Sequence, residues 1–236
     1  MVGAGRLGRA LVDRLRAAGV DVAGPQGRGA DGEGFDAVLL CVPDAEIAAA
    51  AALIKPGRLV GHCSGATGLD VLEPHEAFSL HPLMTVTAEG ANFDGAGAAI
   101  AGSSPAAVSL ARTLAERLGL MPVEIAAEDR VAYHAAASIA SNFLVTLEAA
   151  AERLAVTTGI ERRMLVPLVA ATVQNWGRLG GKRALTGPVA RGDVGTVEAQ
   201  RRAVAERTPE LLELFDALVR ATGSLAGRPE RELAVR

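Results

Sequence analysis

Three glycines near the start of the chain are spaced as in loops that bring backbone N–H groups close to a phosphate. Gly3-Ala4-Gly5-Arg6-Leu7-Gly8 follows the pattern G-x-G-x-x-G and opens a helical pattern. The first glycine of this pattern permits a tight turn, the second lets the backbone approach a pyrophosphate, and the third lets the helix pack closely. The following helix adds its N-terminal N–H donors and the positive end of its dipole. We therefore predict a dinucleotide-binding loop made of Gly3, Gly5, Arg6, Leu7 and Gly8. A glycine turn without a ligand is the alternative.

The segment about 20 residues further on bears on the choice of dinucleotide. An NAD-binding chain usually carries an Asp or Glu there, which holds the ribose diol. Residues 23–28 contain no acid and end in Arg28, which suits a 2′-phosphate. The sequence therefore favours NADP (NADPH) as cofactor. The alternative is that Arg28 is a solvated side chain in a glycine-rich loop.

Polar residues also follow two predicted strands, at the edge of an α/β sheet where ligands bind. Ser64 and Gly65 follow a strand over residues 59–63, and we expect them to lie near the nicotinamide. His81 follows a strand over residues 77–80, and the proline after it keeps it out of helical geometry. We expect His81 to face the substrate. A loop histidine bonded to the backbone is the alternative.

A third group of polar residues lies on a long helix predicted over residues 129–155. His134, Ser138 and Asn142 are four residues apart and share one helix face among alanines. We predict that this face lines a cleft and that the three side chains serve catalysis, with Tyr133 as a further proton donor. The alternative is a helix-packing seam whose polar groups satisfy one another.

Two other chemistries fit the sequence less well. Cys63 in Gly-His-Cys-Ser-Gly could be a nucleophile at a strand-to-helix turn, but residues 66–74 form a poor helix. A zinc site of His62, Cys63, His75 and His81 is disfavoured because adjacent strand residues point to opposite faces. We expect no metal, and we expect the two cysteines to be small buried hydrophobes.

Composition excludes several classes of protein. The chain has 236 residues, a formal charge of −3, 50% hydrophobic and 3% aromatic residues. No basic face or arm suggests a nucleic-acid partner, and no apolar run approaches the ~20 residues that span a bilayer. Two cysteines form no disulfide framework. We expect a cytoplasmic protein with a small-molecule substrate and neither a membrane nor a nucleic-acid partner.

The elements that must position these residues change in character along the chain. Short apolar runs over residues 20–23, 35–42, 59–63, 77–80, 98–101 and 122–125 alternate with helices over 45–54, which Asp44 can cap, and 105–118. After residue 125 only helical patterns follow. We predict an α/β domain over 1–125, with a Rossmann-type doubly wound, mostly parallel sheet, and an all-α domain over 126–236. A fingerprint loop should follow a buried strand, yet only Met1 and Val2 precede Gly3, so the first strand looks truncated.

The motifs occur in a fixed order that resembles one family. After the glycine loop come VPD, HCSG and SLHPL, and the helical half holds YHAAASIASN and LTGPVARGD. Together they resemble the Rossmann-like proteins with the domain of unknown function 2520, of the broad class of 6-phosphogluconate dehydrogenase and pyrroline-5-carboxylate reductase. The resemblance implies an NADP-dependent oxidoreductase that dimerises through its helical domain, with the cleft between the two domains.

The resemblance also assigns residues. It implies that Val42, Pro43 and Asp44 border the adenosine and the nicotinamide ribose. Ser64 and His81 would lie near the nicotinamide, facing His134, Ser138 and Asn142 across the cleft. Dehydrogenases of this broad class resemble one another in a lysine on the first interdomain helix, but the only lysines here are Lys55 and Lys182.

The missing lysine shapes the functional hypotheses. Reduction of a ketone needs an acid near the developing alkoxide, so His134 or Tyr133 would have to serve, whereas a protonated imine needs none. We expect hydride transfer between the nicotinamide and a small, carboxylated carbonyl or imine compound, and the missing lysine favours an imine or a similarly activated substrate. The alternative is a dinucleotide-binding or structural dimer without catalysis.

Overall fold

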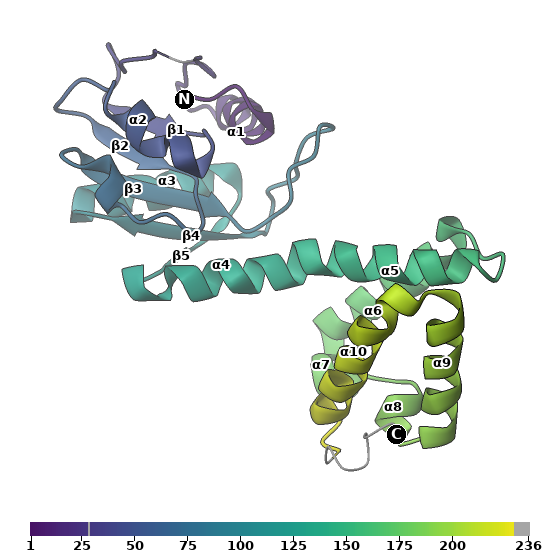
Figure 1. Ribbon diagram of the computed structural model, residues 1–236. Coiled ribbons are helices and arrows are strands. Elements are labelled where there is room, and N and C mark those ends of the chain that lie inside the picture. Colours follow the sequence, from purple (N-terminus) through teal and green to yellow (C-terminus); the bar gives the residue numbers. More distant parts are fainter. Residues whose placement is uncertain (28, 229–236) are drawn as a thin grey trace. The chain divides into compact units, whose positions relative to one another are not determined.

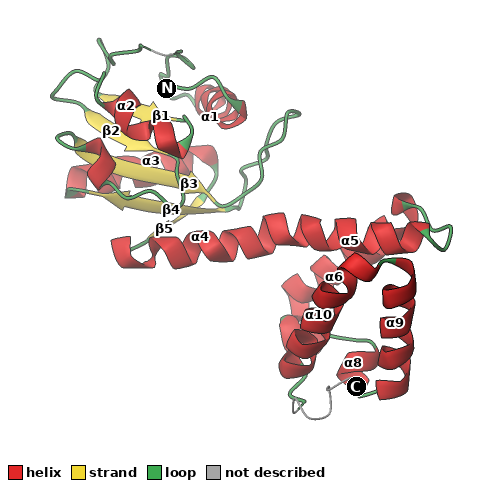
Figure 2. Ribbon diagram, viewed as in Figure 1, coloured by secondary structure: helices red, strands yellow, loops and turns green. Residues whose placement is uncertain are grey.

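The computed structural model describes residues 1–27 and 29–228. The chain divides into two compact units, Met1–Asn142 and Phe143–Arg236. The first unit holds a β-sheet with helices on its faces, and the second is helical (Figures 1 and 2). The predicted fold class, a Rossmann-type α/β sheet followed by an all-α part, is thereby confirmed. The last strand ends at Glu124, and the division between the units falls later, after Asn142.

Within the described residues, the sheet has five strands, and their order in the sheet is their order along the chain. They are β1 (Ala37–Leu40), β2 (Leu59–His62), β3 (Glu76–Pro82), β4 (Gly97–Gly102) and β5 (Met121–Glu124). Only the β3–β4 pair is antiparallel. Because β1, β2 and β3 run parallel, their carboxyl ends meet at one edge of the sheet. Asp44 follows β1 and Ser64 follows β2, whereas His81, predicted to follow a strand over residues 77–80, lies within β3, which extends to Pro82.

Helices cover both faces of the sheet because successive strand residues point to opposite sides. In β1, Leu39 packs into the same core as α1 (Arg6–Ala17) and α3 (Pro105–Leu118). Its neighbours Val38 and Leu40 pack into a second core with α2 (Ile47–Ala51). This arrangement explains why the sequence of β1 is continuously apolar.

The local sequence sets the ends of α3. Ser104 accepts a hydrogen bond from the Ala107 N–H, and Pro105 occupies the first helical position. Gly119 ends the helix with φ +86°, a conformation that favours glycine. The helix therefore occupies residues 105–118, as predicted.

The strand predicted over residues 20–23 is wrong. Val2 forms only isolated bridges, to Gln26 on one side and Leu40 on the other. The Gly3 N–H donates to the Gln26 carbonyl and the Gln26 N–H to the Met1 carbonyl, both over 2.9 Å. The backbone before Gly3 thus lies where a central strand would run, but it offers too few pairing positions to make residues 20–23 a strand.

No strand follows β5 among the described residues, as predicted, but the single helix predicted over residues 129–155 is interrupted by a π-helical segment. The helices of this part are α4 (Arg130–Ser138), a π-helical segment (Ile139–Phe143), α5 (Leu144–Val156), α6 (Arg162–Leu179), α7 (Gly181–Ala184), α8 (Pro188–Arg191), α9 (Val194–Arg207) and α10 (Leu212–Leu225). The Asp193 carboxylate caps α9 by accepting from the Thr196 N–H. Ala150, Val204 and Leu211 form a small core. No helix in the described ranges is both long and apolar enough to cross a membrane.

Candidate functional site

The glycine loop has the geometry that each glycine of the fingerprint requires. Gly3 has φ +108°, and a Cβ there would lie 2.3 Å from the Cys41 carbonyl oxygen. A Cβ on Gly8 would lie 2.0 Å from the Gly3 carbonyl oxygen, so α1 can pack here only on a glycine. A Cβ on Gly5, in contrast, would meet nothing within 4 Å. Gly3 and Gly8 therefore build the turn, whereas Gly5 faces the open space that a ligand would occupy.

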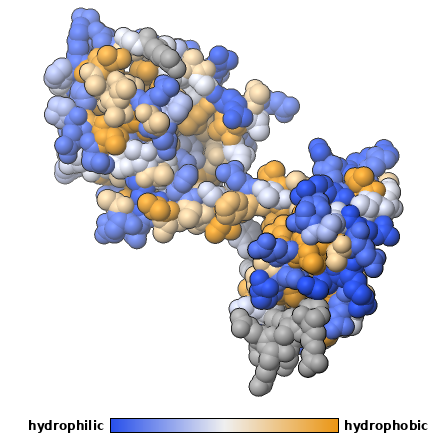
Figure 3. Space-filling view, in the orientation of Figure 1, coloured by the Kyte–Doolittle hydropathy of each residue, from blue (hydrophilic) through white to orange (hydrophobic). Residues whose placement is uncertain are grey.

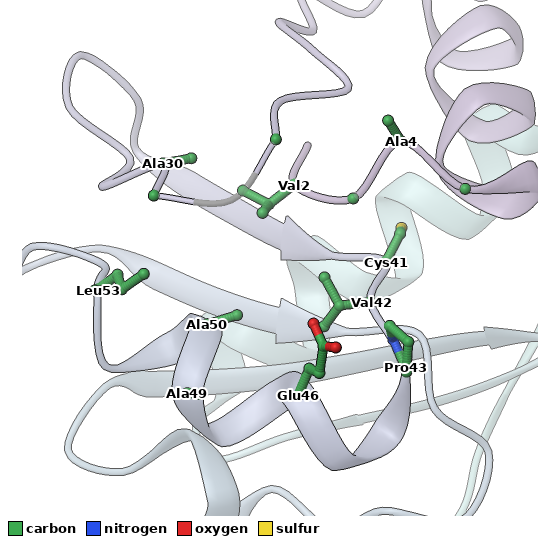
Figure 4. A pocket seen from close by; sticks show the side chains of 14 residues that line it. Val2, Ala4, Ala30, Cys41, Val42, Pro43, Glu46, Ala49, Ala50 and Leu53 are labelled. Carbon is green, nitrogen blue, oxygen red and sulfur yellow. The ribbon is translucent and has the colours of Figure 1, made fainter.

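A pocket of about 490 Å³ lies beside this loop (Figure 4). Its lining comes from the glycine loop, from the segment after β1, from α2 and Leu53 beyond it, and from residues 27, 29 and 30: Val2, Gly3, Ala4, Gly5, Gly27, Gly29, Ala30, Cys41, Val42, Pro43, Glu46, Ala49, Ala50 and Leu53. Arg6 and Leu7 form the start of α1, where no side chain caps the helix and the first turn holds no acid. That end of α1 is therefore suited to an anion. Arg28 lies outside the described residues.

The carboxylate predicted to cap a helix has another role in the structure. Asp44 is the first residue of a 3-10 turn (Asp44–Glu46) before α2; the N-cap of this turn is Pro43 and that of α2 is Glu46, so Asp44 caps neither. The Ser64 hydroxyl instead donates to Asp44 Oδ2 over 2.7 Å. Capping was thus the wrong expectation, because a polar partner from the loop after β2 takes the carboxylate. The bond ties the loop after β1 to the loop after β2.

The Ser64 hydroxyl makes its hydrogen bonds within the protein. Its oxygen accepts from the N–H groups of Ala66 (3.2 Å) and Thr67 (2.9 Å), and its single proton lies between two acceptors, Asp44 Oδ2 at 2.7 Å and the Thr67 hydroxyl at 2.9 Å. A hydroxyl has one proton and two lone pairs, so these bonds use its full capacity. Ser64 therefore shapes the loop near the predicted nicotinamide position and has no bonding capacity left for a ligand.

His62 and Cys63 are buried, whereas Cys41, also expected to be buried, is partly exposed and lines the pocket. The His62 Nδ1 accepts from the Ser64 N–H, so its Nε2–H donates to the Gly68 carbonyl over 3.0 Å. Burial lowers the pKa of His62. A hydrogen bond with Cys41 and burial raise the pKa of the Cys63 thiol well above its usual value, which works against a nucleophilic role. His75 bonds the Ala51 carbonyl instead of joining the other histidines.

Three rings and one glycine come together at the end of β3. His81 Nδ1 lies 2.8 Å from the Tyr133 hydroxyl, and the two rings meet edge to face. The His81 and His134 ring centroids are 6.0 Å apart. A Cβ on Gly65 would lie 2.7 Å from His134 Cδ2 and 2.9 Å from His81 Nε2. Gly65 is thus a glycine because both imidazoles occupy the space of its side chain.

The charges around His81 keep its ring neutral. Burial, helped by the nearby His134 and Arg130, lowers the pKa of His81 to about 4, and only Asp44 among the charged groups that act on it works in the opposite direction. Burial raises the pKa of Tyr133. At neutral pH the pair is therefore an uncharged imidazole hydrogen-bonded to an uncharged phenol.

Arg130 is a site residue that the sequence analysis missed. Its side chain is buried, with 3% of the residue exposed. It donates to the Ser64 carbonyl over 3.2 Å and to the Ser79 hydroxyl over 2.6 Å. It therefore fastens the start of α4 to the sheet, and with it Tyr133 and His134. The signal was present, because Arg130 lies one step before the i, i+4, i+8 line that starts at His134.

The predicted polar line is only partly brought together. His134 reaches the cluster, whereas Ser138 is the last residue of α4 and Asn142 lies in the π-helical segment. The wider turn of that segment breaks the α-helical spacing that placed Asn142 in line. Their predicted catalytic roles remain predictions.

The fold and the glycine loop place the chain among Rossmann-type α/β proteins with a helical C-terminal part. The model of the family described as Domain of unknown function (DUF2520) matches residues 96–222, and the chain belongs to that family. The resemblance found in the sequence is thereby confirmed. No curated protein sequence matches the chain.

Solved structures share this fold. "Putative NADP oxidoreductase BF3122" from Bacteroides fragilis is 20% identical, with 94% of this chain and 96% of that chain covered and a TM-score of 0.80. Protein TM1727 from Thermotoga maritima is 27% identical over 81% and 79% of the two chains, with a TM-score of 0.74. The pyrroline carboxylate reductase of Plasmodium falciparum, solved with NADP bound, is 14% identical over 94% and 96%, with a TM-score of 0.61.

Proposed function

We propose that this protein is an NADP(H)-dependent oxidoreductase that transfers hydride between the nicotinamide and a small carbonyl or imine compound. The observation that carries the proposal is that the three glycines of the loop are required for different reasons. Gly3 and Gly8 cannot hold a Cβ without a clash with backbone, whereas Gly5 opens on the pocket. Steric necessity within the chain explains Gly3 and Gly8 but not Gly5; a pyrophosphate against the backbone explains all three.

The residues present fit the pyrophosphate and the adenosine of a dinucleotide. The uncapped start of α1 and the glycine loop would hold the pyrophosphate, and the apolar wall formed by Val42, Pro43 and α2 would border the adenosine. NADP over NAD rests on residues 23–28, which lack an acid, and on the relatives named for or bound to NADP. When bound, the cofactor supplies the hydride chemistry, and the protein supplies orientation and charge.

The reacting end would lie at the same edge of the sheet. The Asp44–Ser64 bond joins the segment after Pro43, which lines the pocket, to Gly65, against which His81 and His134 pack. Three groups in this cluster can exchange protons with a substrate: His81, His134 and Tyr133. They could take the role of proton donor or acceptor for which this chain has no lysine on the helix. The pyrroline of the Plasmodium relative is a cyclic imine, which keeps imines among the candidate substrates.

Thermal unfolding with NADPH, with NADH and without ligand tests the proposal. A midpoint raised by NADPH and less by NADH, followed by NADPH oxidation that saturates with a small ketone, aldehyde or cyclic imine, would support it. A shift without turnover across such a panel would favour the non-catalytic dinucleotide-binding protein. If neither nucleotide shifts the midpoint, the cofactor assignment fails and the structural dimer is favoured.

We also propose that the helical unit forms a homodimer. The α6 helix has 18 residues and none is buried, yet it exposes Met164, Val166, Leu168, Val173 and Trp176. Figure 3 shows hydrophobic residues at the surface of this unit. A helix that is apolar on several faces needs a partner surface, and a second copy supplies one by matching the same patch to itself.

A further inference from the structure

The two nitrogens of the His81 ring have different surroundings. Nδ1 lies 2.8 Å from the Tyr133 hydroxyl. Nε2 is directed at Gly65, close to where a Cβ on that residue would lie, at 2.9 Å. One nitrogen is therefore committed to a protein partner, and the other lies beside a residue that has no side chain.

The chemistry of the pair decides where the protons lie. Because the pKa of His81 is lowered to about 4, its ring is neutral at pH 7 and carries a single N–H. A phenol is a stronger donor than a neutral imidazole N–H, and an imidazole nitrogen is a stronger acceptor than a phenol oxygen. The favoured arrangement has the Tyr133 O–H donating to Nδ1, which leaves the proton of the ring on Nε2.

The groups that face His81 support this arrangement. His134 and Arg130 come from α4, His62 comes from the end of β2 and Asp44 from the segment after β1. The Asp44 carboxylate accepts from Ser64, and no hydrogen bond joins it to His81 among the described residues. Three basic groups against one acid disfavour a second proton on the ring.

We propose that Tyr133 is a positioning residue that fixes the Nε2–H tautomer of His81, so that His81 offers a hydrogen-bond donor to a lone pair of the substrate. This inference rests on the proposed oxidoreductase function and narrows its substrate class. A carbonyl oxygen or an unprotonated imine nitrogen has the lone pair that this donor needs. An iminium nitrogen has none, so the site selects neutral acceptors over iminium cations.

Anchoring explains why Tyr133 can do this. The buried Arg130 side chain fixes the start of α4 through Ser64 and Ser79, one helical turn before Tyr133. The edge-to-face contact then holds the two rings with centroids 5.6 Å apart. A donor held by such contacts does not have to reorganise during the reaction, which is the condition for effective electrostatic catalysis.

Nitrogen-15 NMR of the ligand-free, full-length chain tests the tautomer without any assay of activity. The chain has four histidines, and His81→Gln identifies the signals of His81. At pH 7.5 we expect one protonated nitrogen, Nε2, and an unprotonated Nδ1. In Tyr133→Phe, which keeps the ring, we expect loss of the fixed tautomer and averaging of the two His81 nitrogen shifts.

His62 and His75 are the internal controls, because backbone carbonyls hold both. Their signals should be the same in Tyr133→Phe, which shows that the variant folds. A wild-type proton on Nδ1, averaged tautomers in the wild type, or unchanged His81 signals in Tyr133→Phe would overturn the inference. A missing NADPH-induced thermal shift would instead overturn the proposed function, so the two failures are distinguishable.

A matched pair of compounds tests the substrate class. We expect NADPH oxidation with a small ketone or with 1-pyrroline as the free imine, and at least a tenfold lower rate with N-methyl-1-pyrrolinium, whose nitrogen carries no lone pair. Equal or faster reduction of the pyrrolinium cation would show that His81 does not act as the donor. If no compound is reduced, the NMR result alone decides the role of Tyr133.

Discussion

Replacement of Gly5 by alanine should remove dinucleotide binding and leave the fold intact. A Cβ at Gly5 meets nothing within 4 Å, and the residue has φ −70° and ψ −177°, which alanine adopts readily. Loss of the glycine at the N-cap costs about 0.5–1 kcal/mol of helix stability. The lower entropy of the unfolded alanine chain returns about 0.4–1 kcal/mol. The free energy of unfolding should therefore change by less than about 0.5 kcal/mol.

NADPH binding, unlike stability, should be strongly affected by the Gly5→Ala substitution. NADPH at 100 times its Kd adds about 2.7 kcal/mol to the free energy of unfolding, which corresponds to roughly 5–10 °C in the midpoint for a chain of this size. A methyl group at position 5 would stand between the backbone and the pyrophosphate. We expect the Gly5→Ala variant to lose this shift at the same NADPH concentration.

Two further variants make the assay decisive. Gly195→Ala, also near a helix N-terminus and with only an ordinary contact at 4.0 Å, should keep the full NADPH shift. Gly8→Ala should unfold at lower temperature even without ligand, because its Cβ would meet the Gly3 carbonyl oxygen at 2.0 Å and overpacking costs about 1–3 kcal/mol. A Gly5→Ala variant with the wild-type NADPH shift would refute the assignment of the pyrophosphate to this loop.

The other predictions concern the histidine cluster and the helical unit. Arg130→Met should lower the free energy of unfolding by about 2–3 kcal/mol in urea, because the Ser64 carbonyl and the buried Ser79 hydroxyl lose a charged donor; an unchanged urea midpoint would speak against the anchoring role. Because the His81 pKa is about 4 in the folded chain and near 6.5 in the unfolded chain, the unfolded chain binds the proton first, and stability falls as pH drops from 6.5 toward 4. This contribution amounts to about 2 kcal/mol between pH 7 and pH 5. Over this range the free energy of unfolding in urea should therefore fall by about 2 kcal/mol less in His81→Gln than in the wild type. An identical pH dependence of the two proteins would contradict the lowered pKa of His81. Trp176→Glu should convert a dimer into a monomer in sedimentation velocity, since Trp176 is 62% exposed on α6; a monomeric wild type would rule out the homodimer.

The sequence was most informative where local rules and burial agree. β1 was predictable because a continuous apolar run marks a strand that is covered on both faces, and α3 because Ser104, Pro105 and Gly119 mark the ends of a helix. The strand predicted over residues 20–23 failed because a strand exists only through its partner, and Val2 offers just isolated bridges. Periodicity carries no information about the length of a partner strand.

The candidate site was predictable only in part, for a related reason. Residue type and spacing identified the glycine loop and His134, but they could not show which polar groups the protein itself would occupy. Asp44 has the right type and place for a cap and instead binds Ser64. The role of Gly65 was equally hidden, because the two imidazoles that exclude its side chain come from β3 and α4. Such contacts depend on packing between elements that are distant in the sequence.

The arrangement of charge links the two ends of the proposed cofactor site. At one end, the start of α1 has no acid in its first turn and no side-chain cap, so its N–H donors and positive dipole end favour an anion. At the other end, Arg130 is buried beside neutral His81, while Asp44 is engaged by Ser64. A buried positive charge stabilises negative charge that develops nearby. The alkoxide or amide-like nitrogen formed when hydride reaches a neutral carbonyl or imine carries such charge, whereas an iminium cation becomes neutral on reduction. The charge of Arg130 and the proposed tautomer of His81 thus favour the same substrate class, and a preference for iminium cations would contradict both.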